Sequence, residues 1–271
     1  MITRKNEIID FHTHIFPDQL APRAIATLVK RSNYIYRPVH DGTVSGLLRN
    51  MDDWGIDASV IQPVITKASQ LKSTNEWVRS ICSDRIIGFG GIYPHTDHYK
   101  EDIDFVAGLG LKGLKFHAEY QNFVLDDEKM LKIYDYALGK GLIIIHHAGF
   151  DPGNPPPFKS TPKQFINVAK AMRGGVIIAA HLGGHGYWDD TEEYLAGSGI
   201  YLDTSMGFSY YPREQFLRIA KKHGTDKLLF ASDAPWSAAK EEIEQIKSLP
   251  LPESDAYAIL GGNARRILGR V

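Results

Sequence analysis

Cysteine and long hydrophobic runs are scarce in this sequence, and each scarcity excludes a class of protein. Among 271 residues there is one cysteine, Cys82, which excludes an internal disulfide framework and a thiolate metal site. Nowhere do 18 apolar residues run together, and no apolar segment of signal-peptide length follows the charged start "MITRKNEIID". We therefore expect a cytoplasmic protein without a membrane span.

An excess of charge of either sign is also missing. The chain has 31 basic and 32 acidic residues, which gives a formal net charge of -1. Because binding to a phosphate backbone depends on clustered positive charge, nucleic acid is not an expected partner, and a small-molecule substrate is. The composition is ordinary for a globular protein and shows no internal break. It predicts one domain over residues 1–271 and leaves open whether the chain forms a homo-oligomer.

What the sequence does contain is a repeated alternation of two patterns. Short runs rich in β-branched residues predict strands within residues 7–11, 58–64, 86–93, 111–117, 142–147, 175–181, 199–205 and 227–233. Amphipathic stretches predict helices within residues 18–31, 43–55, 101–110, 127–141, 161–175 and 212–224. Near-continuously apolar strands that alternate with helices indicate a parallel sheet. Eight such units predict an α/β fold of the (β/α)8 TIM-barrel type.

One insertion departs from this alternation. The segment "FDPGNPPPFKSTP", residues 150–162, is too rich in proline for a helix or a central strand. We expect a stiff loop over one end of the barrel, where long loops often shape a substrate site.

Histidines and one aspartate fall at the C-terminal ends of the predicted strands, where the active sites of TIM barrels form. Strand alternation places Asp10, His12 and His14 on one face of the first strand. The later strand ends carry His117, His147, His181 and Asp233. Imidazoles with a carboxylate suit Zn²⁺, and Mn²⁺, Fe²⁺ or Co²⁺ also accept them.

Each of these residues also has a structural explanation. A lone histidine at a strand end is more often a packed core residue than a ligand, and Asp233 is also placed to cap the next helix. His146 and His147 face opposite ways on a regular strand, and alternation alone does not choose between them. Lys115 has three interpretations: a carbamylated bridge to a second metal, a cation for a substrate carboxylate, or a buried partner of Glu119 or Asp10.

The motifs together resemble a known family. "DFHTHIFP", "GLKFHAEYQ", "GLIIIHHAG", "IIAAHLGG", "LLFASDAPW" and "ILGGNARRILG" occur in the order found in the amidohydrolase superfamily. They are most similar to its amidohydrolase-2 group, which includes aminocarboxymuconate-semialdehyde decarboxylase-like enzymes and dicarboxylate lactonases. The resemblance implies that His12, His14, His147 and Asp233 bind the metal and that His146 faces outward. It also implies that His181 orients or deprotonates a metal-bound water, while Lys115 and His117 match a position of variable role.

Two other families share the opening motif but fit less well. TatD-like nucleases carry a metal-bridging glutamate at the end of the third strand, and "IIGFGGIYPH" offers none. Phosphoesterases of the polymerase-and-histidinol-phosphatase type also resemble "DFHTHIFPD", but "AHLGG" and "SDAPW" fit the amidohydrolase-2 pattern better.

The leading hypothesis is a metal-dependent hydrolase of a small, carboxylated amide, lactone or ester. One divalent ion, Zn²⁺ first, would polarise the scissile carbonyl and lower the pKa of its water. Asp233 would accept the proton, and His181 would act as a second base or as a donor to the developing oxyanion. Asp10 would accept a hydrogen bond from a ligand imidazole. The expected substrate pocket consists of Lys115, His117, Tyr120, Phe150 and Trp236, with Phe208 as a further wall and Arg213 as a further carboxylate anchor.

Two alternatives use the same residues differently. A non-oxidative decarboxylase of a carboxylated unsaturated or aromatic molecule needs the same ligands. A non-catalytic barrel would hold a structural metal, and structural zinc sites are closed by four protein ligands.

Overall fold

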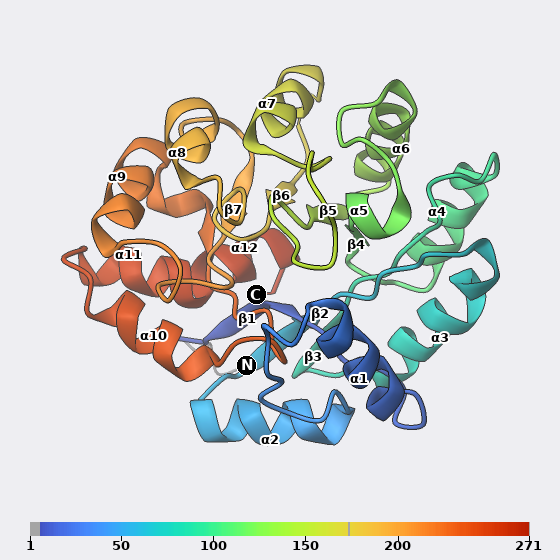
Figure 1. Ribbon diagram of the computed structural model, residues 1–271, viewed down its shortest axis with the longest axis horizontal. Coiled ribbons are helices and arrows are strands. Elements are labelled where there is room, and N and C mark those ends of the chain that lie inside the picture. Colours follow the sequence, from blue (N-terminus) through green and yellow to red (C-terminus); the bar gives the residue numbers. More distant parts are fainter. Residues whose placement is uncertain (1–5, 173, 271) are drawn as a thin grey trace.

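The computed structural model describes residues 6–172 and 174–270, and its centre is a ring of eight short parallel strands (Figure 1). The strands are β1 (Ile9–Thr13), β2 (Ala58–Ile61), β3 (Ile86–Gly88), β4 (Gly113–Phe116), β5 (Ile143–His146), β6 (Ile177–Ala179), β7 (Tyr201–Asp203) and β8 (Leu228–Leu229). Seven lie within runs that the sequence predicts as strands, and β1 begins within its predicted run, residues 7–11, and extends two residues beyond it. The prediction of a (β/α)8 barrel is confirmed.

Backbone hydrogen bonds close the ring. Strands β1 to β3 form one parallel sheet and β4 to β8 another. The sheets join on one side where the Gly90 N–H donates to the Gly113 carbonyl at 2.8 Å. On the other side the Phe11 N–H donates to the Phe230 carbonyl at 2.9 Å. The strand ends therefore surround one axis, which brings side chains from distant parts of the sequence together.

Helices surround the barrel in the alternating order that the sequence predicts (Figure 1). They are α1 (Ala21–Arg31), α2 (Val44–Trp54), α3 (Leu71–Ile81), α4 (Tyr99–Gly108), α5 (Ala118–Gln121), α6 (Glu128–Gly139), α7 (Pro162–Ala171), α8 (Trp188–Asp190), α9 (Arg213–His223), α10 (Ala239–Lys247), α11 (Glu253–Tyr257) and α12 (Asn263–Leu268). Short turns of 3-10 or π geometry are η1 (Ala68–Gln70), η2 (Thr191–Leu195), η3 (Thr225–Lys227) and η4 (Ala258–Gly262). Two helices, α1 and α2, lie between β1 and β2, where one is enough to connect parallel strands.

Local sequence signals explain where helices begin and end. The Thr43 hydroxyl caps α2 by accepting a hydrogen bond from the Gly46 N–H at 2.9 Å, and Gly55 ends the helix with a φ of 70°. Helix α7 begins with a capping box between Thr161 and Gln164. It ends at Ala171, a few residues before the predicted boundary.

Strand alternation divides the core into two layers. The barrel interior contains side chains from alternate strand positions: Ile9, Phe11, Ala58, Val60, Ile87, Phe89, Ile143, Ile145, Ile178, Leu229 and Ala231. The intervening positions pack against the surrounding helices. The interior is therefore packed with apolar side chains below the strand ends, and the polar residues lie above them.

His146 belongs to the outer layer. Its ring stacks on Phe116 with the ring centroids 5.1 Å apart and contacts Tyr134 edge-on at 5.0 Å. The prediction that His146 faces away from the barrel axis is confirmed, and His147 is the residue that faces inward.

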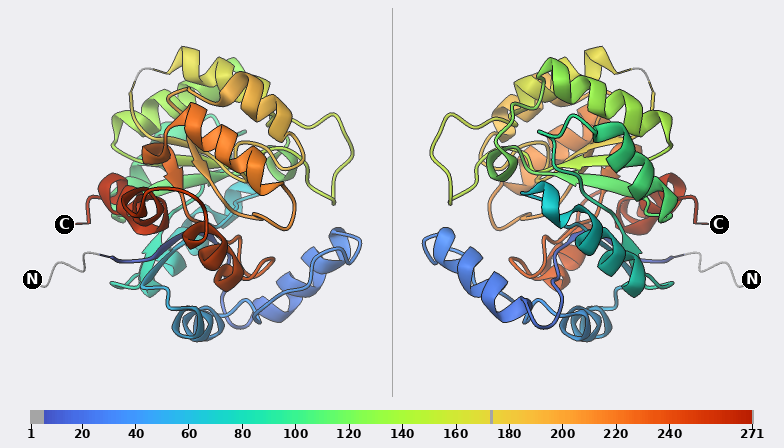
Figure 2. Two further views of the ribbon diagram at one scale, coloured as in Figure 1. Left: turned by 90° about the vertical axis from the view of Figure 1, so that its left-hand side faces the viewer. Right: turned by 90° about the vertical axis from the view of Figure 1, so that its right-hand side faces the viewer.

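The C-terminal ends of the strands are covered by two segments outside the barrel wall. Figure 2 shows α1 and the loop between β5 and α7 at the same end of the barrel, opposite the start of β1 and helix α12. The loop at residues 150–162 has no helix or strand before α7, as the sequence predicts. Within the described residues, no helix combines the length and apolarity needed to cross a membrane.

Glu242 of α10 ties that helix to the segment that follows β7. Its side chain is 4% exposed and its Oε2 accepts a hydrogen bond from the Phe208 N–H at 3.4 Å. Burial raises the pKa of this carboxyl group to about 7.

The Glu242→Gln variant tests this pairing by pH. A carboxyl group whose pKa is higher in the folded state stabilises below its unfolded pKa, and that stabilisation is lost as the pH rises through 7. We expect the variant to exceed the wild type in free energy of unfolding at pH 8, by up to about 3 kcal/mol at 1.36 kcal/mol per pKa unit. The difference should shrink toward pH 4.5, and urea unfolding at both pH values measures it. A pH-independent difference would contradict the assignment.

Candidate metal centre and substrate cavity

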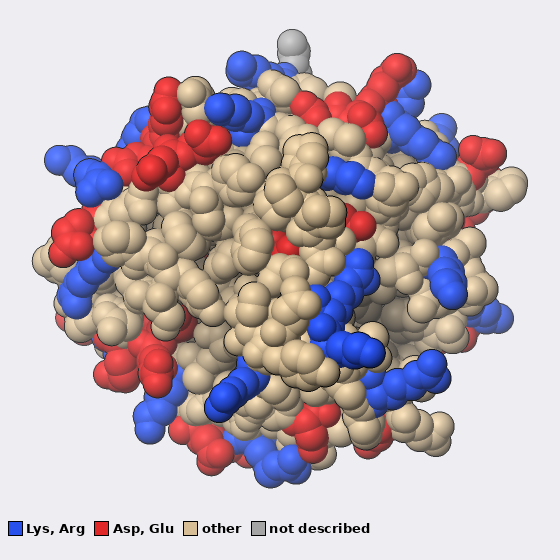
Figure 3. Space-filling model, in the orientation of Figure 1, with Lys and Arg blue, Asp and Glu red and all other residues tan. Residues whose placement is uncertain are grey.

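A cavity of about 530 Å³ opens at the C-terminal ends of the strands. Its floor is formed by strand-end side chains, and its walls come from α1, α3 and the loop after β5. Figure 3 shows basic side chains beside the hollow near the centre of this face. The volume is in the range of small-molecule sites.

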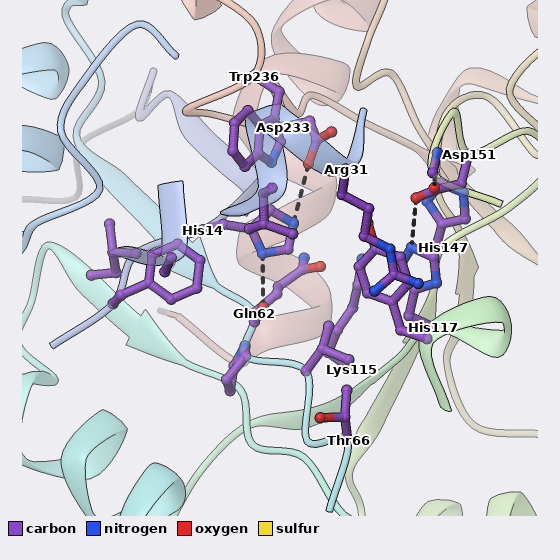
Figure 4. A pocket seen from close by; sticks show the side chains of 18 of the residues that line it. His14, Arg31, Gln62, Thr66, Lys115, His117, His147, Asp151, Asp233 and Trp236 are labelled. Atoms are coloured by element: carbon purple, nitrogen blue, oxygen red, sulfur yellow. Dashed lines mark hydrogen bonds and ion pairs between the residues drawn. The ribbon is translucent and has the colours of Figure 1, made fainter. Parts of the chain in front are cut away.

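Three donor atoms converge on one side of the cavity, from His12, His14 and Asp233. Figure 4 labels the second and the third. The Nε2 atoms of His12 and His14 are 3.1 Å apart, and Asp233 Oδ1 lies 3.1 Å from the second and 3.4 Å from the first. The Nδ1 atom of each ring donates a hydrogen bond. His12 Nδ1 donates to Asp203 at 2.9 Å, and His14 Nδ1 donates to the Gln62 carbonyl at 2.9 Å. Since both Nδ1 atoms donate, the Nε2 lone pairs face the carboxylate oxygen.

A β-bulge in β1 gives His12 its direction. The pairing of β1 with β2 shifts by one residue between Asp10 and Thr13. The bulge separates the faces of Asp10 and His12, which regular alternation would keep together. The Asp10 carboxylate instead accepts hydrogen bonds from the Ser232 N–H at 2.9 Å and hydroxyl at 2.5 Å. The expectation that Asp10 accepts a hydrogen bond from a ligand imidazole is therefore wrong.

Asp203, at the end of β7, takes the position expected for Asp10. Its Oδ2 accepts from His12 Nδ1, while its Oδ1 accepts from the Ser205 hydroxyl at 2.5 Å and the His181 N–H at 2.9 Å. The side chain is fully buried. One carboxylate thus fixes His12 of β1 together with His181 and Ser205, which follow β6 and β7.

The same network sets the protonation of two further imidazoles. The Ser205 hydroxyl has one proton, which it donates to Asp203, so its oxygen accepts the Nδ1 proton of His181 at 2.8 Å. The Nε2 atom of His181 then accepts from His147 Nδ1 at 3.0 Å. This leaves an unprotonated Nε2 on His147, a buried atom without a described hydrogen-bond partner.

His117 lies between two rings on the other side of the cavity. It stacks on Tyr120 at 3.8 Å and on His147 at 4.2 Å, each with an interplanar angle of 5°. Its Nε2 is 3.2 Å from Asp151 Oδ2. The side chains of His117, His147 and Asp151 are a second set of potential ligands. However, parallel stacked rings direct their lone pairs in parallel, so the His12, His14 and Asp233 set is better arranged around one ion.

Lys115 reaches the site from the interior face of β4. Its Nζ lies 2.8 Å from His12 Nε2, and the side chain is 1% exposed. Burial lowers the pKa of the ammonium group to about 8, while Asp233 and Asp203 act in the opposite direction. The ammonium group of Lys115 therefore contacts the imidazole ring of His12 directly.

Burial also keeps the imidazoles neutral. It lowers the pKa of His12, His147 and His181 well below the ordinary value, and the positive charge of Lys115 adds to the effect. Neutral imidazole is the form that binds metal ions.

Strained backbone accompanies the site residues. His181 and Asp233 have φ values of 57° and 67°, in the left-handed region that favours glycine. The Asp233 N–H donates to the His12 carbonyl at 2.8 Å, which holds the carboxylate beside the imidazole. Such strain persists where surrounding contacts determine it, and it concentrates at functional sites.

Most residues that the sequence singles out lie around this cavity. The lining includes His12, His14, Lys115, His117, Tyr120, His147, Phe150, His181, Asp233 and Trp236. Two expectations are wrong. Phe208 packs on Tyr211 and Phe216 and is outside the lining, and Arg213 bonds to Ser248 on the exposed surface.

Several polar residues at the site escaped the sequence reasoning, among them Arg31, Asp151, Asp203 and Ser205. For Asp203 and Ser205 a signal was present, because "LDTS" ends the seventh predicted strand at the same end as the histidines. Arg31 and Asp151 lie in a helix and a loop, where strand periodicity gives no information.

Comparisons with known proteins identify the family and agree with the fold. Residues 9–270 match the amidohydrolase family Amidohydro_2. A search of curated proteins found no significant match. Solved structures share the fold, including 5-carboxyvanillate decarboxylase LigW from Sphingomonas paucimobilis, with 16% identity and a TM-score of 0.70 over 97% of this chain and 99% of that one.

Two further structures share the fold at similar distance. A dihydroxybenzoic acid decarboxylase from Polaromonas sp. JS666, solved with manganese and 2-nitroresorcinol, has 15% identity, a TM-score of 0.71 and 97% coverage of each chain. A probable 2-pyrone-4,6-dicarboxylic acid hydrolase from Acinetobacter baumannii, solved with citric acid, has 16% identity and a TM-score of 0.65 over 97% and 99% of the two chains.

The resemblance drawn from the motifs is confirmed, since the family match covers nearly the whole sequence. The barrel, its polar strand ends and this match together show that the chain belongs to the amidohydrolase family Amidohydro_2.

Proposed function

We propose that this protein is a metal-dependent hydrolase of a small carboxylated substrate with an amide, lactone or ester bond. The observation that carries the proposal is the convergence of His12 Nε2, His14 Nε2 and Asp233 Oδ1 within 3.4 Å of one another. Three lone pairs at these distances repel one another unless positive charge lies beside them. The Lys115 ammonium group, 2.8 Å from His12 Nε2, supplies part of that charge, and a divalent cation beside the three atoms would supply the rest.

The donor set suits such an ion. Neutral imidazoles and a carboxylate are ligands for Zn²⁺, the ion we propose, and also for Mn²⁺, Fe²⁺ or Co²⁺. We propose His147 as a further ligand because its buried Nε2 has no described hydrogen-bond partner. Carbamylation of Lys115, beside His12, would add oxygen donors for a second ion.

The bound ion would polarise the substrate carbonyl and make water more acidic. The chain's own residues then handle protons. His181 donates a hydrogen bond from Nδ1 to Ser205 and accepts one from His147 Nδ1 at Nε2, so Nε2 would serve as a base when the contact with His147 opens. Asp233 would accept a proton beside His14. Tyr120, Phe150 and Trp236 line the cavity as substrate walls, with His117 and Lys115 as polar contacts.

A decarboxylase acting on a carboxylated unsaturated or aromatic molecule is the second candidate. The aromatic lining favours it, because Tyr36, Trp77, Tyr120, Phe150 and Trp236 all border the cavity and suit a planar substrate. The proposed ligands are the same for both reactions. For either reaction, the cytoplasmic location inferred from the sequence stays a prediction.

A paired assay distinguishes the two reactions. The purified, metal-loaded protein is given carboxylated lactones, with ring opening followed by proton release, and hydroxylated aromatic acids, with CO₂ release measured. We expect turnover in one series, reduced at least about 100-fold in His181→Ala because the base is lost. If neither series reacts faster with the wild type than with Asp233→Ala, the enzymatic proposal fails.

Metal content tests the ligands separately from activity. We expect His12→Ala, His147→Ala and Asp233→Ala to lower the bound metal measured by elemental analysis, because each removes a donor. His146→Ala is the matched control, since the neighbouring ring lies in the outer layer and should leave metal content unchanged. Loss of metal in the His146 variant with retention in the His147 variant would reverse the assignment.

The orienting role of Asp203 gives a further prediction. Asp203→Asn should weaken metal affinity about 10- to 100-fold, the usual effect of removing a carboxylate that holds a ligand imidazole. Asp10→Asn is the matched control, because that carboxylate bonds to Ser232 on the other face of β1. Competition with a chromogenic chelator measures both affinities. A larger loss in the Asp10 variant would show that the wrong carboxylate has been assigned.

A further inference from the structure

Helix α1 presents an apolar stripe to the cavity. Leu20, directly before the helix, is followed at four-residue intervals by Ala24 and Leu28, so the three side chains lie on one helix face. All three border the cavity, and Leu20 is 57% exposed. Of the residues in α1, only Ala21 is buried. The stripe is therefore apolar surface that faces the cavity instead of the core.

A different face of α1 attaches the helix to the rest of the protein. The Ile25 side chain lies against Gly42, where an added Cβ atom would be 2.9 Å from it. Neighbouring positions on a helix point about 100° apart, so Ile25 is directed away from the stripe. Figure 2 shows α1 projecting from the end of the barrel. The attachment of α1 through Ile25 thus leaves the stripe free to contact a ligand.

One face of α3 and the turn before it form a second wall. Gln70, Ser73, Thr74 and Trp77 border the cavity at intervals of three and four residues. Figures 1 and 2 both place α3 next to α1 at this end of the barrel. Within the described part of the chain, no charged side chain of α3 borders the cavity.

The polar groups of this wall bond mostly to one another. Gln70 Oε1 accepts hydrogen bonds from the Thr66 N–H at 2.9 Å, the Lys67 N–H at 3.1 Å and the Thr66 hydroxyl at 3.3 Å. The Ser73 hydroxyl donates to the Gln70 carbonyl at 3.5 Å. These contacts leave few polar atoms of the wall for a ligand, and the indole ring of Trp77 adds apolar surface beside them.

The charged side chains of the lining lie in another part of the cavity. Lys115 and Asp233 are at strand ends, and Asp151 is in the loop after β5. Arg31 is the last residue of α1, but its guanidinium carbon lies 4.2 Å from the centre of the Tyr120 ring. The cavity therefore has a charged part beside the proposed metal site and an uncharged part between α1 and α3.

We propose that the space between α1 and α3 binds an uncharged hydrocarbon arm of the substrate while the reacting group lies beside His12, His14 and Asp233. Apolar walls with few free polar atoms favour the exchange of water for hydrocarbon. A cavity of about 530 Å³ has room for both parts of such a molecule. The substrate class is then an elongated molecule with a polar reacting head and an apolar tail. This inference rests on the proposed function, because it names the substrate class of the same site.

Straight-chain carboxylic acids test the arm without turnover. Calorimetric titrations of the metal-loaded protein compare butanoate with octanoate, which differ only in chain length. We expect octanoate to bind more tightly by on the order of 100-fold, since each buried CH₂ group contributes a factor of about 4. Ala24→Phe places a ring in this space. It should bind butanoate as the wild type does and octanoate at least about 10-fold more weakly than the wild type.

Ala26→Phe is the matched control, because Ala26 is exposed on the same helix and outside the cavity lining. It should keep the wild-type ratio of the two affinities. Thermal unfolding verifies that both variants are folded. Equal affinity of the wild type for the two acids, including no binding of either, overturns the proposal. A preference retained in Ala24→Phe, or lost equally in Ala26→Phe, also overturns it. Because the titrations require no turnover, they can succeed even if the hydrolase and decarboxylase assays both fail.

Discussion

Burial of imidazole rings at one end of the barrel is the constraint on which the site depends. Desolvation keeps His12, His147 and His181 neutral, and a neutral ring must place one proton and one lone pair with suitable partners. The structure meets this requirement by giving each ring a defined acceptor or donor. The lone pairs that remain then point into the cavity, where they are available for chemistry.

Asp203 satisfies that requirement for two imidazole rings at once, those of His12 and His181. Because one carboxylate accepts from the His12 ring and, through Ser205, orients His181, the proposed ligand and the proposed base share a single support. The backbone N–H of His181 bonds to the same group. Interactions that share a buried group are not additive, so His12 and His181 are energetically coupled in this fold.

The sequence predicted the structure correctly wherever a local pattern, such as an apolar run, determines the element that forms. Apolar runs predicted the eight strands, and barrel closure then brought His12, His14 and Asp233 together. The prediction for the hydrogen-bond partner of Asp10 failed because it assumed regular alternation along the strand. A bulge, which depends on pairing with β2, breaks that alternation. Arg31 was not singled out because its place at the cavity depends on a tertiary contact with Tyr120, and helix periodicity carries no such information.

Helix α1 lies outside the repeating strand–helix units, as an extra element between β1 and α2. It borders the cavity and adds no strand to the wall. Sequence change in this helix can therefore remodel the cavity while the floor of strand-end side chains keeps its geometry. Exchange of this helix between related barrels, in evolution or by engineering, can therefore change the substrate selectivity of the cavity and leave the folding of the barrel largely undisturbed.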